Sequence, residues 1–450
     1  MEAQTKQETV STFGYKQELQ RSLTLRDLVV YGMIFMVPIA PFGIYGSVAQ
    51  GSGGMVALTY LIGMVGMIFT ALSYARMSEA FPIAGSVYSY AQRGINPTVG
   101  FFAGWVLLLD YILVPSLLYL VSASALGELV PSVPVWVWLI VFIAVNTLIN
   151  IRGIEFTAKA NMIVLAFELI VLLLFIIVGL TALINGVGGG FSLKPIYDAN
   201  HFSMPLVMGA VSIAVLSFLG FDGISTLAEE TKGGVNTVGK AAIIALFGVG
   251  GLFIVQTWIA AMIWPDFTSF ENADVAFYQI AELAGGPWLK NLCILATVIS
   301  WGLANALAAQ AAISRILYSM GRDKNLPAFL AKVHPRFKTP YLSTVLVAVI
   351  SLLVGLFFMN QLAALTSLVN FGALTAFLLL HVSVFNHYFL RNKSGNVVKH
   401  LLLPLIGFLI IGYVWYSLDA MSKELGFIWL GIGVVYYLFL KISKRTVVLE

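Results

Sequence analysis

Residues 36–46 read MVPIAPFGIYG and place two prolines and two glycines in the middle of an apolar segment. Proline lacks a backbone N–H, and its ring clashes with the preceding turn of a helix. Glycine adopts the bent conformations that other residues avoid. We therefore expect the membrane helix across residues 27–49 to unwind at residues 38–43.

A second interrupted segment, residues 217–225, reads SFLGFDGIS and carries two glycines and an acid. Single glycines and prolines are ordinary in membrane helices, because neighbouring helices satisfy the freed backbone groups. These two interruptions, however, fall at the same place in two successive blocks of five apolar segments. Matched interruptions of this kind are the best sequence indication of a transporter binding site. Because five is odd, the second block must be inverted relative to the first.

The composition agrees with a membrane protein. Of the 450 residues, 59% are hydrophobic and 10% are charged, against roughly 25% charged in an average soluble domain. A span needs about 20 apolar residues, and long apolar runs without alternation favour helices over a barrel. We expect an all-α polytopic membrane protein with twelve spans, near residues 27–49, 54–78, 98–126, 134–150, 160–184, 205–228, 241–264, 286–317, 341–359, 362–387, 400–418 and 424–441.

The positions of Lys and Arg predict the topology, because cytoplasmic loops carry an excess of them. Twelve spans put both termini on one side, and that side then holds all but three of the 25 basic residues. We expect a cytoplasmic N-terminal tail at 1–26, a transport core of spans 1–10 at 27–387, spans 11 and 12 at 388–441, and a cytoplasmic tail at 442–450. The predicted location is the cell membrane. The three exceptions are Lys194, Lys290 and Lys423.

Three motifs carry a family resemblance over nearly the whole chain: FPIAGSVYSY at 81–90, the stretch 217–230, and SRILYSMGRD at 314–323. With them, the chain resembles the amino acid–polyamine–organocation (APC) superfamily, nearest to bacterial putrescine importers and amino acid permeases. The resemblance implies a LeuT-type fold of five plus five inverted repeats with two further C-terminal helices. It also implies alternating access and a small-molecule substrate, either an amino acid or an organic amine.

The first interruption departs from the patterns that this resemblance implies. Putrescine importers of the group have an aspartate where this chain has Gly43, and many amino acid carriers have Gly-Ser-Gly where Ile39, Ala40 and Pro41 stand here. An amine needs carboxylates to replace its lost hydration. An amino acid carboxylate could instead bind backbone N–H groups at the unwound turn, although Pro41 offers none.

The candidate substrate site comprises the residues of both interruptions. Asp222 is the charged member of this set, and an acid within a membrane helix is a functional hypothesis by default. It can pair with a substrate amine, carry a proton, or cap the half-helix that follows it. The full predicted set is Ile39, Ala40, Pro41, Phe42, Gly43, Ser217, Phe218, Leu219, Gly220, Phe221 and Asp222.

Three acids are candidates for proton coupling: Glu168, Asp222 and Asp110. Glu168 lies within the span at 160–184, where the resemblance implies a lysine in many relatives, and intramembrane acids commonly form proton relays. Each also has a structural alternative, as a satisfied acid bonded to a neighbouring helix. The span at 286–317 lacks the adjacent Ser/Thr pair that the resemblance implies for sodium-coupled relatives, which favours protons over sodium.

Other classes of function find little support. Residues 234–240, GVNTVGK, match part of a phosphate-binding loop, but Ala241 follows in place of Ser or Thr and no strand precedes it. The histidines show no metal-binding spacing, and Cys293 is the single cysteine. We expect no enzyme activity, cofactor, metal or nucleic-acid partner, and the oligomeric state stays open. The predicted function is a proton-coupled secondary active importer of amino acids, with a putrescine or polyamine importer as the alternative. A channel and a membrane-embedded enzyme are the rivals from other classes.

Overall fold

The computed structural model describes residues 23–81, 86–153, 158–232, 236–322 and 326–442. Most of both predicted tails therefore lies outside the described residues. Within those ranges the chain forms helices and no strand, apart from one isolated bridge between Leu23 and Thr231. The α-helices are α1 (Leu25–Met36), α2 (Tyr45–Gly51), α3 (Val56–Ala80), α4 (Ser86–Gly94), α5 (Pro97–Leu129), α6 (Val135–Arg152), α7 (Ala158–Ile184), α8 (Met204–Ala214), α9 (Thr237–Ile263), α10 (Ala276–Gly285), α11 (Pro287–Thr297), α12 (Ala306–Arg322), α13 (Tyr341–Phe357), α14 (Leu362–Val384), α15 (Leu403–Tyr416) and α16 (Ala420–Ile442).

Short 3-10 and π-helical segments connect or extend these helices. The 3-10 segments are η2 (Ala40–Gly43), η3 (Val215–Phe218), η4 (Phe221–Glu230), η5 (Ala273–Val275) and η7 (Ala328–Ala331). The π-helical segments are η6 (Val298–Asn305), η8 (Phe385–Arg391) and η9 (Val398–Leu402).

Ten helices in the described ranges are long and apolar enough to cross a membrane. Two shorter apolar helices, Met204–Phe218 and Tyr341–Phe357, occupy the places of the other two predicted spans. Many apolar side chains on the peripheral helices point outward, among them Leu148, Ile163 and Val435, each more than half exposed. Such faces suit contact with lipid, because lipid tails are as apolar as these side chains. The protein is therefore a multi-pass membrane protein.

The first predicted interruption is confirmed. A capping box between Thr24 and Asp27 begins α1, which ends at Met36, and α2 begins only at Tyr45. Between them lies the single 3-10 turn η2. The carbonyl oxygen of Pro38, which lies outside the regular helix, accepts a hydrogen bond from Gln256 Nε2 of α9, at 3.0 Å. A neighbouring helix thus satisfies the open backbone within the membrane, as it must where water is absent.

The second interruption is also confirmed, and it lies against the first. Helix α8 continues into η3, which ends at Phe218, and Gly220 turns the chain with φ +111° before η4 begins. A Cβ atom at Gly220 would be 2.8 Å from the backbone of Phe35 in α1. Two features of this position require glycine: other residues rarely adopt this φ, and the backbone of α1 lies too close to leave room for a side chain.

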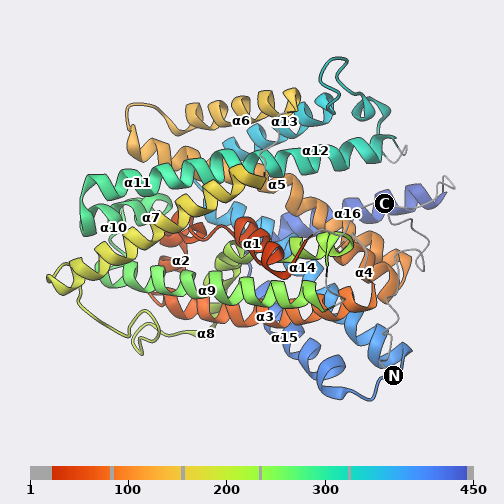
Figure 1. Ribbon diagram of the computed structural model, residues 1–450, viewed down its shortest axis with the longest axis horizontal. Coiled ribbons are helices and arrows are strands. Elements are labelled where there is room, and N and C mark those ends of the chain that lie inside the picture. The colour runs from red at the N-terminus through yellow and green to blue at the C-terminus, as the bar shows by residue number, and fades with distance from the viewer. Residues whose placement is uncertain (1–22, 82–85, 154–157, 233–235, 323–325, 443–450) are drawn as a thin grey trace.

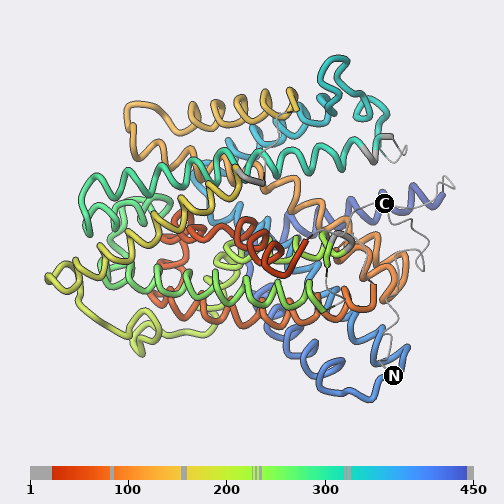
Figure 2. The backbone as a smooth tube through the Cα atoms, viewed as in Figure 1, coloured from red at the N-terminus to blue at the C-terminus, as the bar shows by residue number. Residues whose placement is uncertain are grey.

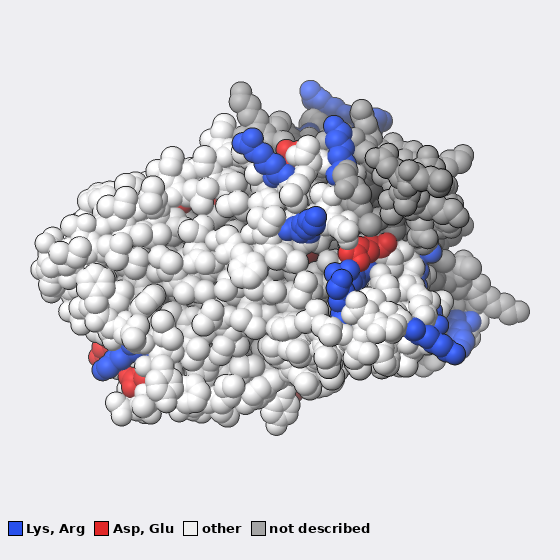
Figure 3. Space-filling model, turned by 60° about the horizontal axis from the view of Figure 1, so that its bottom comes forward, with Lys and Arg blue, Asp and Glu red and all other residues white. Residues whose placement is uncertain are grey.

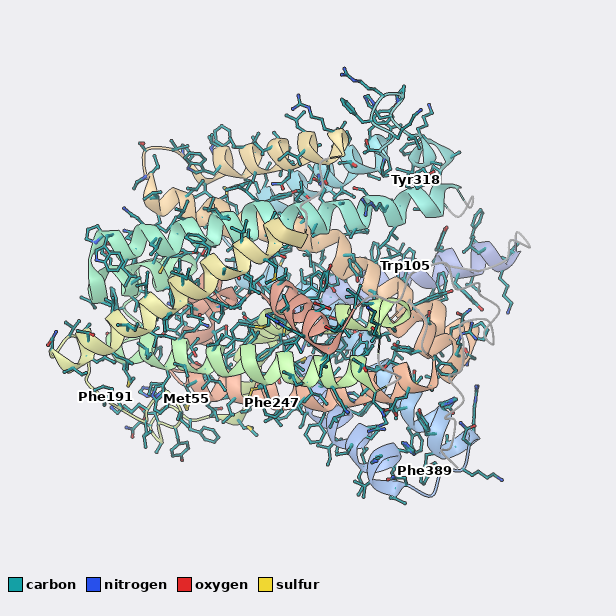
Figure 4. All side chains as sticks on the ribbon, viewed as in Figure 1. Met55, Trp105, Phe191, Phe247, Tyr318 and Phe389 are labelled. Carbon is teal, nitrogen blue, oxygen red and sulfur yellow. The ribbon has the colours of Figure 1, made fainter. Side chains whose placement is uncertain are left out.

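The interrupted segments occupy the middle of the bundle. In Figure 2, α1, η2 and α2 lie near the centre of the view, with α3 and α9 running together along one side. In Figure 1, α6, α12 and α13 form a layer on the opposite side. On the flank formed by α5 and α16, Trp105 (labelled in Figure 4) and Trp429 each donate an indole N–H to the other's backbone carbonyl, at 2.9 and 2.8 Å.

The two ends of the bundle differ in charge. Lys and Arg gather at the right-hand end in Figure 3, where α4 and α16 finish. We call this the basic end. The opposite end holds α10 and the start of α11 (Figure 1) and shows few basic side chains in the same view.

Candidate functional site

A cavity of about 390 Å³ lies where the two interruptions meet. This volume falls within the roughly 300–1,000 Å³ that is usual for small-molecule sites. The walls come from α1, η2, α5, the turn between η3 and η4, η6, α12 and α14. Most of the lining is apolar, and its polar members include Asp110, Tyr111, Asp222, Trp301 and Asn305.

Two carboxyl groups face this cavity, and no Lys, Arg or His is among the described residues that line it. Asp222 comes from the second interruption. Its Oδ1 accepts a hydrogen bond from the Gly220 N–H at 3.1 Å, and its Oδ2 accepts one from the Tyr74 hydroxyl at 3.5 Å. Part of its role is thus structural, since it holds the turn that interrupts the helix.

Asp110 lies on α5 and has fewer hydrogen-bond partners than Asp222. Its Oδ1 is buried and has no hydrogen-bond partner among the described residues. The close approach of α5 and α14 fixes its position, because a Cβ at Gly372 would be 2.6 Å from the Val106 carbonyl oxygen and 3.2 Å from the Asp110 N. An unpartnered buried carboxylate oxygen is costly. A proton on this acid or a bound hydrogen-bond donor would relieve that cost.

The cavity contacts only some of the residues predicted for the site. Ala40, Leu219, Gly220 and Asp222 line it, together with Asp110. The other seven residues of the predicted substrate site are not among those that line the cavity. They are Ile39, Pro41, Phe42, Gly43, Ser217, Phe218 and Phe221.

These other residues hold the interruptions in place. The Ser217 hydroxyl is 3.2 Å from the Tyr60 hydroxyl, and Phe218 packs against Phe253 with ring centres 5.2 Å apart. Phe221 packs edge-on against Tyr74 at 5.8 Å. These contacts anchor the second interruption to α3 and α9.

The first interruption is anchored in the same way. A Cβ at Gly43 would be 2.5 Å from Val121 Cγ1 on α5, so the turn packs directly on that helix. Two of its backbone donors are already used: Ala40 N–H bonds Val37 O at 2.8 Å, and Phe42 N–H bonds Ile39 O at 2.9 Å. A substrate carboxylate cannot take these donors without breaking the turn.

An aromatic layer lies between the first interruption and the end opposite the basic end. Phe42 stacks on Phe277 with ring centres 4.0 Å apart, and Phe175 lies 4.6 Å from Phe277. Tyr45 meets the same ring edge-on at 5.7 Å. All four side chains are fully buried. The layer buries the first interruption on this side.

Glu168 does not line the cavity, but it touches an element that does. It lies on α7 with 3% of its surface exposed, and its Oε1 accepts a hydrogen bond from the Ser300 hydroxyl of η6. Its Oε2 has no partner among the described residues. Trp301 and Asn305 of the same π-helical segment line the cavity. π-helical turns are often found at functional sites, and this one joins a buried acid to the cavity wall.

The sequence did not single out three residues of this arrangement: Tyr74, Phe277 and Ser300. Tyr74 and Ser300 lie in apolar runs and Phe277 lies between two predicted spans, and each acquires its contact from a helix distant along the chain. No signal in a single sequence marks them. The described residues contain no group of three His, Cys, Asp or Glu side chains able to hold a metal ion.

Comparison with known proteins agrees with this architecture. The family model described as amino acid permease matches residues 28–438. The low-affinity putrescine importer PlaP of Escherichia coli is 34% identical over 427 residues, which cover 93% of each chain. The branched-chain amino acid permease BcaP of Bacillus subtilis is 27% identical, covering 98% of this chain and 97% of that one. The methylthioribose transporter of the same organism is 26% identical over 96% of both.

Proposed function

The chain belongs to the amino acid permease family, and we propose that it is a secondary active importer of small organic amines, with diamines such as putrescine as the first candidates. At a coarser level it is a transporter of amino acids or amines. Of these two substrate classes, we propose the amine.

The observation that carries this choice is the pair of acids in the cavity. Asp110 and Asp222 face the same mostly apolar space, and within the part of the chain that the structure describes no basic side chain lines it. Two carboxylates in one enclosed site repel each other, and either a proton on one of them or a nearby cation relieves the repulsion. An aliphatic diamine brings two ammonium groups and an apolar chain between them, which matches the two acids and the apolar wall.

An amino acid fits this cavity less well. Its carboxylate would need a basic side chain or free backbone donors, and the donors of Ala40 and Phe42 are engaged within the turn. The sequence alone puts amino acids first, because the first interruption lacks the expected acid. The cavity favours the opposite order, because its acids come from α5 and from the second interruption. The putrescine importer among the relatives, at 34% identity, supports the same order.

We further propose transport by alternating access, with the core at 27–387 built as two inverted five-helix repeats and the helices of 388–441 flanking it. The basic end would face the cytoplasm, with both termini on that side. The cavity then reaches toward the cytoplasm past Phe35 and Ala312, while the aromatic layer of Phe42 and Phe277 closes the outer side. Import would require this layer to open.

Proton coupling is proposed through Glu168. It is buried, one of its oxygens is unpartnered, and Ser300 links it to the cavity wall. Loading and release of a proton at this carboxyl would alter the bond to η6 and so the packing beside the substrate.

The test is uptake by the purified protein in proteoliposomes, with and without an imposed proton gradient. The substrate panel contains putrescine, a monoamine of equal length, leucine and glutamate. We expect saturable, gradient-driven uptake of putrescine that leucine does not inhibit. Uptake of leucine with no competition by putrescine would refute the choice of substrate, and a requirement for sodium would refute the coupling ion.

A further inference from the structure

A second pocket, of about 600 Å³, lies at the end of the molecule opposite the basic end. Its walls come from the end of α5, the start of α6, the η5 segment and the link between α13 and α14. In the proposed orientation it opens to the outside. The pocket is separate from the central cavity, and the two share no lining residue.

Three acids line this pocket: Glu128, Glu271 and Asp274. Glu128 forms an ion pair with Lys290 at 2.8 Å, and Lys290 also pairs with Glu282 at 2.8 Å. Glu271 and Asp274 form no ion pair with the described residues. The pocket therefore keeps an excess of negative charge after its internal pair is counted.

Two observations indicate that the pocket holds a ligand. The Ser124 side chain lines it and is 6% exposed, yet its hydroxyl has no hydrogen-bond partner among the described residues. The Asp274 carboxylate is likewise without a partner, because the one hydrogen bond at this residue joins its backbone N–H to Asn272 Oδ1. Burial raises the pKa of Asp274 to about 6. An acid with a raised pKa, beside a hydroxyl that faces the pocket without a partner among the described residues, suits binding better than packing.

The ligand is not a metal ion, because the described acids do not converge as a group of three on one point. Separated carboxylates around a roomy pocket fit an organic cation whose charges are spread along a chain. The Ser124 hydroxyl can accept a hydrogen bond from an ammonium group, as the acids can.

The pocket also touches the segment that would have to move. A Cβ at Gly46 in α2 would be 2.2 Å from the carbonyl oxygen of Ala273, the residue before Asp274. Helix α2 directly follows the first interruption, and Tyr45 next to Gly46 contacts Phe277 of the aromatic layer. The acidic wall therefore rests on the outer half of the interrupted helix.

We propose that this pocket is an outer binding site for organic polyamine cations, which captures the substrate before the aromatic layer opens. The inference rests on the proposed function, since it takes the transported amine as the ligand. Capture there raises the local concentration of the cation at the entrance.

The experiment compares wild-type protein with the Glu271→Gln/Asp274→Asn variant in proteoliposomes, using radiolabelled putrescine. We expect KM to rise about three- to tenfold with the maximal rate unchanged, because each charge at a partly solvated site contributes a modest attraction. Added salt should raise KM in the wild type and have little effect in the variant, since screening removes the same attraction. Glu424→Gln, an exposed acid at the start of α16, is the matched control and should behave as wild type.

The outcomes separate the two proposals. Unchanged KM and salt dependence in the double variant, with uptake intact, would overturn the outer site and leave the amine importer standing. A wild-type protein that carries no amine would overturn the proposed function and the outer site with it. If the double variant unfolds at a lower temperature than wild type, Glu271→Gln alone decides, because that side chain is exposed, and an unchanged KM then overturns the site.

Discussion

Asp110→Asn should weaken putrescine transport far more than monoamine transport. Asp110 is the better residue to change, because its Oδ1 is unpartnered while Asp222 also holds the turn at Gly220. Asparagine keeps the shape and removes the charge. A hydrogen bond to a charged group contributes about 1.5–3 kcal/mol, which corresponds to roughly a 10- to 150-fold rise in KM for the diamine.

The assay is uptake of putrescine and of n-butylamine by the same proteoliposomes. A monoamine needs one carboxylate, and Asp222 remains in the variant, so its KM should change by less than about threefold. Glu424→Gln controls for the loss of an acid elsewhere. The reasoning would be refuted if Asp110→Asn preserved the preference for the diamine, or if both amines lost affinity equally.

Further predictions concern the first interruption, the coupling acid and the outer pocket. Gly43→Ala should lower the free energy of unfolding by about 1–3 kcal/mol, because its Cβ would lie 2.5 Å from Val121 Cγ1. In the double variant Gly43→Ala/Val121→Ala, thermal unfolding should show that part of this lost stability is recovered. Stability losses that simply add in the double variant would contradict the contact. Glu168→Gln should abolish accumulation driven by a proton gradient while leaving exchange of internal for external putrescine, and wild-type accumulation would contradict its role. Burial raises the pKa of Asp274 to about 6, so lowering the external pH from about 7 to about 5 protonates it and should raise KM, an effect that should be weaker in Asp274→Asn.

The sequence was sufficient to locate the interruptions because their cause is local. Pro38 and Pro41 lack backbone donors wherever the helix lies, and Gly220 permits a turn that other residues disfavour. The same holds for the apolar segments, whose lengths follow from composition alone. These features depend on a few adjacent residues, and a single chain displays them directly.

The direction in which each side chain points could not be predicted in the same way. Phe42 belongs to the first interruption, yet it stacks on Phe277 in the aromatic layer and not on the cavity. The 3-10 and π-helical segments change the angle between successive side chains, so a helical period misplaces them. The bond between Ser300 and Glu168 joins residues 132 positions apart, and only the packed structure brings them together.

The missing acid at Gly43 is therefore weaker evidence against an amine substrate than the sequence makes it. A cation that leaves water needs carboxylate oxygens within hydrogen-bond distance, and the helix that supplies them is immaterial. The turn at Gly43 has no room even for a Cβ beside Val121, so an aspartate could not be added here without displacing the Val121 side chain of α5. Helix α5 instead contributes Asp110 to the same cavity, and the second interruption contributes Asp222. Two carboxylates facing an apolar space meet the requirement of a diamine with the first interruption left uncharged, and the substrate class should be judged from the acids that line the cavity.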